Sequence, residues 1–228
     1  MKKIFVGQAV TGHDINILKE EMEKIYDVLK QRGYSIYSTL EEEGKNIFTV
    51  FFFGTFIPLQ GVEYIIKAAK ILEKESVHFL IVGDGQTKSE ILQLEKQLSP
   101  RNVTFKDTLS QDLLNTEAAK VDACLGIFGD TPKTQRVIPN KVYECLAMKK
   151  SVITADTRAA RELLSDKDVL FVRVADGASL AEGILRLKDD KKTMEKLAQN
   201  GYDTFVKDAT PQMLGRELKN VIEEMLSV

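Results

Sequence analysis

The loop that ends in Glu144 holds the densest group of side chains that could bind an anion. Residues 131–150 contain one acidic residue, Glu144, and five basic ones: Lys133, Arg136, Lys141, Lys149 and Lys150. Pro139 suits the first turn of a helix, because the N–H that proline lacks would have no partner there. A basic loop leading into a helix N-terminus is typical of an anion-binding site, since the first amides and the helix dipole favour negative charge. Glu144, one turn further on, could accept hydrogen bonds from two ribose hydroxyls. A solvated surface loop explains the same residues equally well.

Two glycine-containing loops follow other predicted strands. In the first, Gly54–Gly61, a glycine at each end lets the backbone turn sharply and approach a ligand. Amides at the start of the next helix could then receive a phosphate. The second loop is Gly83-Asp84-Gly85, a Gly-x-Gly without the third glycine of a dinucleotide fingerprint. Each loop by itself is better explained as an ordinary turn.

The elements that would position these loops alternate along most of the chain. Predicted strands are Phe48–Gly54, Val77–Gly83, Val103–Lys106, Ala123–Phe128, Ser151–Ala155 and Val169–Val172. Predicted helices cover residues 62–74, 87–98, 111–119, 139–149, 157–164, 177–187, 190–200 and 211–226. Alternating strands and helices predict an α/β fold, a doubly wound, Rossmann-like parallel sheet with helices on both faces. Ligands bind such sheets at the carboxyl ends of the strands, which is where the three loops lie.

The first 46 residues have a separate pattern. Strand-like segments at Lys3–Gly7 and Tyr34–Ser38 flank a helical stripe made of Leu18, Met22, Ile25 and Leu29. The run 41–46 has no apolar anchor and is interpreted as a linker. We therefore expect a short β-α-β segment and linker over 1–46 and a larger domain over 47–228. We also expect the stripe to pack against the larger domain, because a lone β-α-β unit cannot bury enough surface to be stable.

Composition excludes several classes of protein. The chain has 228 residues and a formal net charge of -2, so no overall basic field favours nucleic-acid binding. The longest apolar stretch, Ile47–Leu59, is too short to span a bilayer. Cys124 and Cys145 fall in segments predicted to be buried, which favours a reducing, cytoplasmic location over a disulfide scaffold. With only two histidines, His13 and His78, and no Cys/His cluster, no metal site is expected.

From about Phe48 to Leu226 the chain resembles the C-terminal, donor-binding domain of retaining glycosyltransferases with the two-domain GT-B fold. The resemblance rests on FFFGTFIPLQGVEYIIKAAKIL, FLIVGDGQ, NVTF, ACLGIFGD and, most specifically, RVIPNKVYECLAMKKSVITAD, which is similar to the Pro-x-Lys-x-x-Glu helix of that family. It implies a nucleotide-diphosphate sugar as the ligand and sugar transfer with retention of configuration. No metal or other cofactor is implied.

The resemblance also implies roles for particular residues. Glu144 would hold the ribose, and the Gly54 loop and the start of the 139–149 helix would embrace the diphosphate. The implied catalytic residues are Arg136, Lys141 and Glu144. The implied donor-binding residues are Gly54, Thr55, Gln60, Gly61, Gly83, Asp84, Gly85, Lys133, Arg136, Pro139, Asn140, Lys141 and Glu144.

Three positions depart from the family pattern. Many members carry Arg after the first glycine and Lys before the second, where this chain has Thr55 and Gln60. Many also have Glu eight residues before the ribose Glu, a position held here by Arg136. A diphosphate carries about two negative charges, so other cations must compensate for the lost ones. Lys133, Arg136 and Lys141 are the available replacements. They lie near the N-terminus of the 139–149 helix, which we expect to be open to solvent.

Other functions stay open at this point. The family needs an N-terminal acceptor-binding domain that 46 residues cannot supply, so a non-catalytic nucleotide or nucleotide-sugar binding module is one alternative. The opening KIFVGQAVTG with LKQRGYSIYS resembles nucleoside 2-deoxyribosyltransferase-like proteins, which makes transfer or hydrolysis on nucleosides a second. A scaffold role without a small-molecule ligand is the third.

Overall fold

The structure is a computed structural model that describes residues 4–6, 36–38 and 47–226. The chain divides into two compact units, Met1–Asn46 and Ile47–Val228, and each is described by itself. In the first unit, strands β1 (Ile4–Val6) and β2 (Ile36–Ser38) pair in parallel, as strands were predicted there. The predicted helical stripe of Leu18, Met22, Ile25 and Leu29 and its packing lie outside the described residues.

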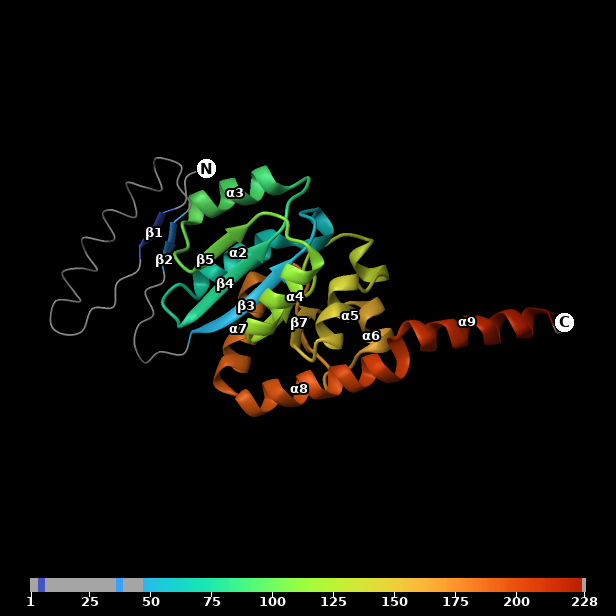
Figure 1. Ribbon diagram of the computed structural model, residues 1–228. Helices are drawn as coiled ribbons and strands as arrows, with labels where there is room; N and C mark the ends of the chain where they lie inside the picture. Colours follow the sequence, from blue (N-terminus) through green and yellow to red (C-terminus); the bar gives the residue numbers. More distant parts are fainter. Residues whose placement is uncertain (1–3, 7–35, 39–46, 227–228) are drawn as a thin grey trace. The chain divides into compact units, whose positions relative to one another are not determined.

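The second unit is built on a sheet of six parallel strands, which confirms the predicted α/β class (Figure 1). The strands are β3 (Phe48–Phe53), β4 (Val77–Val82), β5 (Val103–Lys106), β6 (Ala123–Leu125), β7 (Ser151–Ala155) and β8 (Leu170–Val172). Their order is β5-β4-β3-β6-β7-β8, and each neighbouring pair is parallel. This unit starts at β3 in the middle of the sheet, continues through β4 to the edge strand β5, and then returns to β6 and continues to the other edge at β8.

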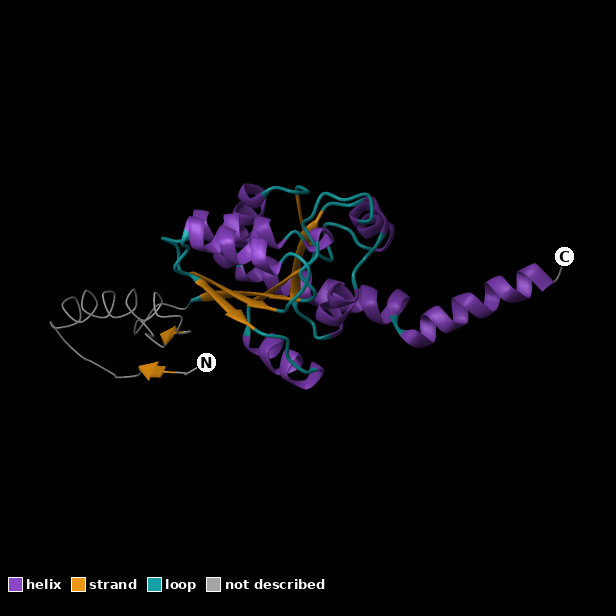
Figure 2. Ribbon diagram, turned by 90° about the horizontal axis from the view of Figure 1, so that it is seen from above, coloured by secondary structure: helices purple, strands orange, loops and turns teal. Residues whose placement is uncertain are grey.

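Helices cover both faces of this sheet (Figure 2). They are α2 (Val62–Ile71), α3 (Lys88–Leu98), α4 (Gln111–Lys120), α5 (Asn140–Ala147), α6 (Arg158–Leu163), α7 (Gly177–Asp189), α8 (Lys191–Thr204) and α9 (Pro211–Leu226). One core lies between the sheet and α2, α3 and α7, and the other lies under α4 and α5. Strand β3 contributes side chains to both cores: Val50 and Phe52 lie in the first, and Phe51 and Phe53 lie in the second. A strand buried on both faces must be apolar throughout, which explains its sequence FTVFFF.

The two cysteines lie in the core under α4 and α5. Cys124 on β6 and Cys145 on α5 are both free and buried. Burial, together with a hydrogen bond to Cys124, raises the pKa of the Cys145 thiol well above its usual value. The predicted burial of both cysteines is confirmed, and a thiol with a raised pKa is a poor nucleophile.

The ends of several elements differ from the predictions. Strand β6 stops at Leu125 instead of Phe128, and two short 3-10 helices, Pro58–Gln60 and Thr134–Arg136, occupy the loops before α2 and α5. Helix α8 runs on to Thr204 and continues as a π-helical turn, Phe205–Ala209.

Helix α9 extends away from the sheet in both views (Figures 1 and 2), and none of its residues is buried. Six of its apolar residues are exposed: Leu214, Leu218, Val221, Ile222, Met225 and Leu226. Among the described helices, none is both long and apolar enough to cross a membrane.

Candidate functional site

The candidate site lies at the carboxyl ends of β3 and β6, where the strand order reverses. Strand β3 is flanked by β4 on one side and by β6 on the other, so the loops that leave β3 and β6 start in opposite directions. A sheet of this kind opens a crevice at such a point, and ligands bind there. The Gly54–Gly61 loop leaves β3, and the residues from Gly126 to α5 leave β6.

The Gly54–Gly61 loop is fixed to the β6 side by direct backbone contact. The N–H of Phe128 donates to the carbonyl of Gln60 (3.1 Å), and the N–H of Gly129 donates to the carbonyl of Leu59 (3.2 Å). Gly61 adopts the left-handed conformation (φ 64°) that starts α2, and a Cβ on it would lie 2.4 Å from the nitrogen of Gly129. The close approach requires glycine at both positions, so the two loops form one rigid platform.

The Gly83–Gly85 loop supports this platform from the β4 side. A Cβ on Gly83 would lie 2.0 Å from the carbonyl oxygen of Gly54, and the N–H of Phe56 donates to the carbonyl of Asp84 (2.8 Å). The Asp84 carboxylate accepts hydrogen bonds from Lys88 Nζ (3.0 Å) and from the N–H of Gly85 (2.6 Å), and both lower its pKa. Asp84 is therefore used locally, in the turn that leads to α3.

Lys141 lies differently from the solvent-exposed cation that the sequence predicts. It belongs to the first turn of α5, yet the residue is only 5% exposed. The ammonium nitrogen stands 3.5 Å from the centroid of the Phe52 ring, a cation–π distance, and it has no hydrogen-bond partner. The expectation of a cation in open solvent is wrong for this residue. Pro139 also lies one position earlier than predicted, as the N-cap of α5 rather than within its first turn.

Gln60 is the second polar side chain buried without a full set of partners. It is 7% exposed, and its Oε1 accepts no hydrogen bond. Gly54 brings the two residues together, because a Cβ on Gly54 would lie 3.1 Å from Lys141 Nζ and 4.0 Å from Gln60 Oε1. Buried polar atoms are normally paired. An unpaired donor and an unpaired acceptor beside one glycine thus mark a place where a polar ligand can supply the missing bonds.

Burial also affects the pKa of Lys141. Loss of hydration lowers the pKa of its ammonium group well below the usual value, and the nearby Cys145 and Glu144 counter this only in part. The cause is general, since an apolar environment penalises the charged form of an amine. In the structure as described, the amine therefore lacks the anionic partner that would keep it charged.

Glu144 lies one turn further along α5 and is half-buried. Its Oε2 accepts a hydrogen bond from Gln111 Nε2 (3.3 Å), and that nitrogen also donates to Asn115 Oδ1 (3.2 Å). Gln111 is the first residue of α4, and no local pattern selects it, because its contact with Glu144 spans 33 positions.

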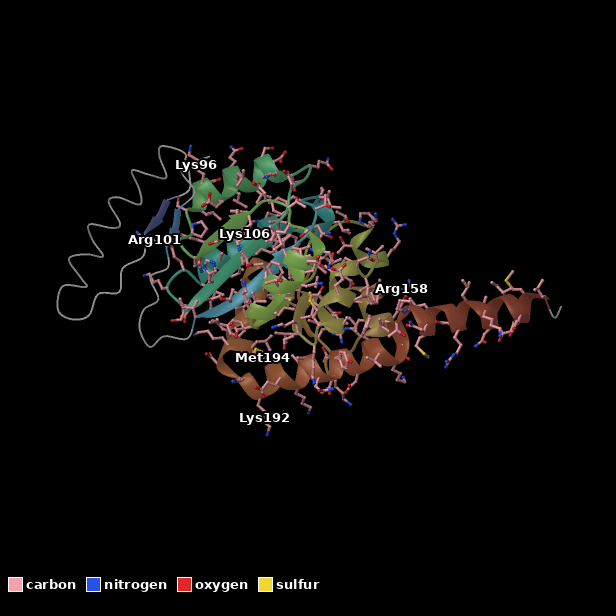
Figure 3. All side chains as sticks on the ribbon, in the orientation of Figure 1. Lys96, Arg101, Lys106, Arg158, Lys192 and Met194 are labelled. Atoms are coloured by element: carbon pink, nitrogen blue, oxygen red, sulfur yellow. The ribbon has the colours of Figure 1, made fainter. Side chains whose placement is uncertain are left out.

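The other predicted residues of the basic loop face solvent. Lys133, Arg136 and Asn140 are exposed, and Arg136 Nε donates to the carbonyl of Pro132 in its own loop (3.1 Å). The loop is tied to α6, because the N–H of Arg158 (labelled in Figure 3) donates to Gln135 Oε1 (3.2 Å). Thr55, in the first glycine loop, is exposed as well. The structure thus groups Gly54, Gln60 and Lys141 and leaves Lys133, Arg136 and Thr55 at the surface.

Two other features of the described part of the chain bear on the kind of ligand it can hold. No group of three or more His, Cys, Asp or Glu residues there could hold a metal ion. A separate hollow of about 310 Å³ lies between Pro58 and α3, but Glu63 and Glu90 line it, which makes it unsuited to a phosphate.

Comparison with known proteins identifies a family and a related glycosyltransferase. Residues 47–190 match the family model described as Glycosyl transferases group 1. The lipopolysaccharide core biosynthesis glycosyltransferase LpsD of Rhizobium meliloti (strain 1021) is 26% identical over 162 residues, which cover 69% of this chain and 44% of LpsD.

Solved structures share the fold at lower identity. The C-terminal domain of the group 1 glycosyl transferase LpcC from Francisella tularensis superposes with a TM-score of 0.61 at 20% identity, covering 72% of this chain and 87% of that one. Anabaena HepE in complex with UDP-glucose gives a TM-score of 0.67 at 18% identity, covering 89% and 53%. The chain therefore spans about half the length of LpsD and of HepE.

Proposed function

The chain belongs to the glycosyl transferases group 1 family, and from this premise we propose that the crevice between β3 and β6 binds a nucleoside-diphosphate sugar. The observation that carries the proposal is the grouping of Lys141 and Gln60 beside Gly54. A diphosphate at Gly54 would give the buried ammonium an anionic partner. The unpaired Oε1 of Gln60 would then accept a hydrogen bond from a hydroxyl of the same ligand, because the diphosphate itself offers only acceptors.

Different residues of the proposed site bind the diphosphate and the ribose of the ligand. The N-terminal turn of α5 carries no acidic side chain, so its amides and dipole favour the diphosphate. Glu144 would hold the ribose hydroxyls, and the hydrogen bond from Gln111 would fix the orientation of its carboxylate. Lys133 and Arg136, exposed beside the crevice, would attract the anion over a longer range.

The proposed reaction is transfer of the sugar to an acceptor with retention of configuration. Lys141 and the α5 dipole would stabilise the diphosphate as it leaves, which requires no metal ion. The chain covers about half of LpsD and HepE, and we propose that an acceptor-binding domain completes the enzyme. We expect the 228-residue chain alone to bind the donor but to transfer sugar slowly, because the acceptor must be held in attacking geometry.

Titration calorimetry with UDP-glucose tests the proposed function. UDP-glucose is the first probe because HepE was crystallised with it, and other nucleoside-diphosphate sugars and the free nucleosides complete the series. We expect saturable binding of at least one sugar nucleotide, and weaker binding of its nucleoside. Failure of every sugar nucleotide to bind at millimolar concentration would contradict the proposal.

Substitution of Glu144 separates the ribose end from the phosphate end. We expect Glu144→Gln to weaken binding of uridine and of UDP-glucose alike, by about tenfold, because an amide forms weaker hydrogen bonds to hydroxyls than a carboxylate does. Glu162→Gln on α6, whose only described partner is Arg158 at 3.8 Å, is the matched control and should bind normally. A loss confined to UDP-glucose would mean that Glu144 does not contact the ribose.

A non-catalytic binding module is the second candidate function. Its support is Arg136, which stands exposed where many family members have Glu. Both candidates predict donor binding, and they differ in turnover. Release of free glucose from UDP-glucose, faster with the wild-type chain than with Glu144→Gln, would favour the enzyme. The alternative of nucleoside deoxyribosyl transfer rests on residues that lie mostly outside the described ones.

A further inference from the structure

The environment of Lys141 determines how a ligand can bind at Gly54. Lys141 Nζ lies 3.5 Å from the centroid of the Phe52 ring. It also lies next to Gly54, where an added Cβ would come within 3.1 Å of it. No backbone carbonyl or carboxylate among the described residues accepts a hydrogen bond from it. A charged ammonium group in such a place would lose its hydration, and the one described group in direct contact that attracts it is an aromatic face.

The charged and titratable groups around Lys141 do not replace that hydration. On its own helix, Glu144 favours the charged form, but it is engaged by Gln111, and Cys145 is a buried thiol that hydrogen-bonds with Cys124 of β6. On the facing side, the Gly54–Gly61 loop contains no ionisable residue. In the loop before α5, Asp130, Lys133 and Arg136 are all exposed.

These observations lead to a prediction about binding, which rests on the proposed function. We propose that the site takes up one proton when it binds a nucleoside-diphosphate sugar, and that Lys141 Nζ receives it. The lone pair of the neutral amine forms the new N–H bond, and the proton comes from the buffer. The bound diphosphate then stabilises the ammonium group that the free site disfavours. Consistent with this, burial already lowers the pKa of Lys141 in the free protein.

Calorimetry in two buffers measures this proton directly. At pH 8, UDP-glucose is titrated in Tris and in HEPES, whose ionisation enthalpies differ, and the slope of observed heat against buffer heat gives the protons taken up. A sugar nucleotide suits the test because it has no terminal phosphate, so it lacks the ionisation near pH 6 that could take up a proton itself. We expect uptake approaching one proton, and an affinity that falls by up to about tenfold per unit as pH rises, because bound protein holds more protons than free protein.

Two variants identify the group. Lys141→Arg carries a guanidinium that stays charged at every accessible pH, so it should abolish the uptake where binding is retained. Lys150→Arg is the matched control, because Lys150 donates to two carbonyls, those of Ala119 and Val121, and should leave the uptake unchanged.

The outcomes are distinguishable. Binding of UDP-glucose to the wild-type chain with the same heat in both buffers would overturn the proton uptake and leave the proposed function intact. Uptake that persists in Lys141→Arg would overturn the assignment to Lys141. Failure of every sugar nucleotide to bind would overturn the proposed function and, with it, this inference.

Discussion

Replacing Lys141 with methionine is expected to weaken the binding of UDP-glucose by about a hundredfold while making the free protein more stable. The loss of affinity follows from removing a charge-assisted hydrogen bond in a buried place, which contributes about 3 kcal/mol at the upper end of its range. The gain in stability follows from removing a buried amine without a hydrogen-bond partner, since such a group costs about 1–3 kcal/mol. Methionine is flexible and apolar, and it can fill the space over Phe52.

Calorimetry and thermal unfolding on the same preparation measure the two effects. For a domain of this size, each kcal/mol raises Tm by about 2–4 °C. Lys150→Met is the matched control and should show the opposite pattern, with normal affinity and a lower Tm, because Lys150 caps two carbonyls near the end of α4. A Lys141→Met protein that binds UDP-glucose normally would show that this lysine does not contact the ligand.

The contact between the Gly54–Gly61 loop and Gly129 should be equally sensitive to substitution. We expect Gly129→Ala to destabilise the protein by about 3 kcal/mol or more, because the added methyl would lie 2.0 Å from the carbonyl oxygen of Pro58 and 2.7 Å from that of Leu59. Both obstacles are backbone atoms, so relief requires the Gly54–Gly61 loop to move away from β6. Such a movement separates Gln60 from Lys141, so binding should be lost as well.

Gly215→Ala provides the matched control for this substitution. Gly215 lies within α9, and nothing stands within 4 Å of a Cβ placed there. The exchange should raise helix stability by up to about 1 kcal/mol and leave binding unchanged. Urea unfolding of both variants compares them directly. Equal stability of the two alanine variants would mean that the contact between the loops is not tight.

The sequence predicted the architecture well because the pattern that specifies it is local. Runs such as Phe48–Phe53 and Val77–Val82 are apolar without alternation, as a strand covered on both faces must be, and the helices between them fix a parallel sheet. The position of the candidate site followed from the same topology, since loops after parallel strands gather at one edge.

The arrangement within the site could not be predicted in the same way. The sequence placed Lys141 among solvated cations, although Cys145, four positions later, lies on the same face of α5 and is buried. That spacing was the available signal that Lys141 points inward. The contact between Gln111 and Glu144 and the docking of Gly61 on Gly129 join distant segments, and no local pattern encodes them.

The buried pair Cys124 and Cys145 allows opening of the core under α5 to be measured by thiol labelling. These are the only two thiols of the chain, and both are enclosed between β6 and α5. A thiol reagent such as Ellman's therefore reacts only after the core under α5 has separated, so the labelling rate measures how often that happens. Because α5 also carries Lys141 and Glu144, a bound sugar nucleotide should slow the labelling in proportion to its occupancy. Ligand affinity and the transient opening of the core can then both be measured with one colour reaction on the unmodified chain.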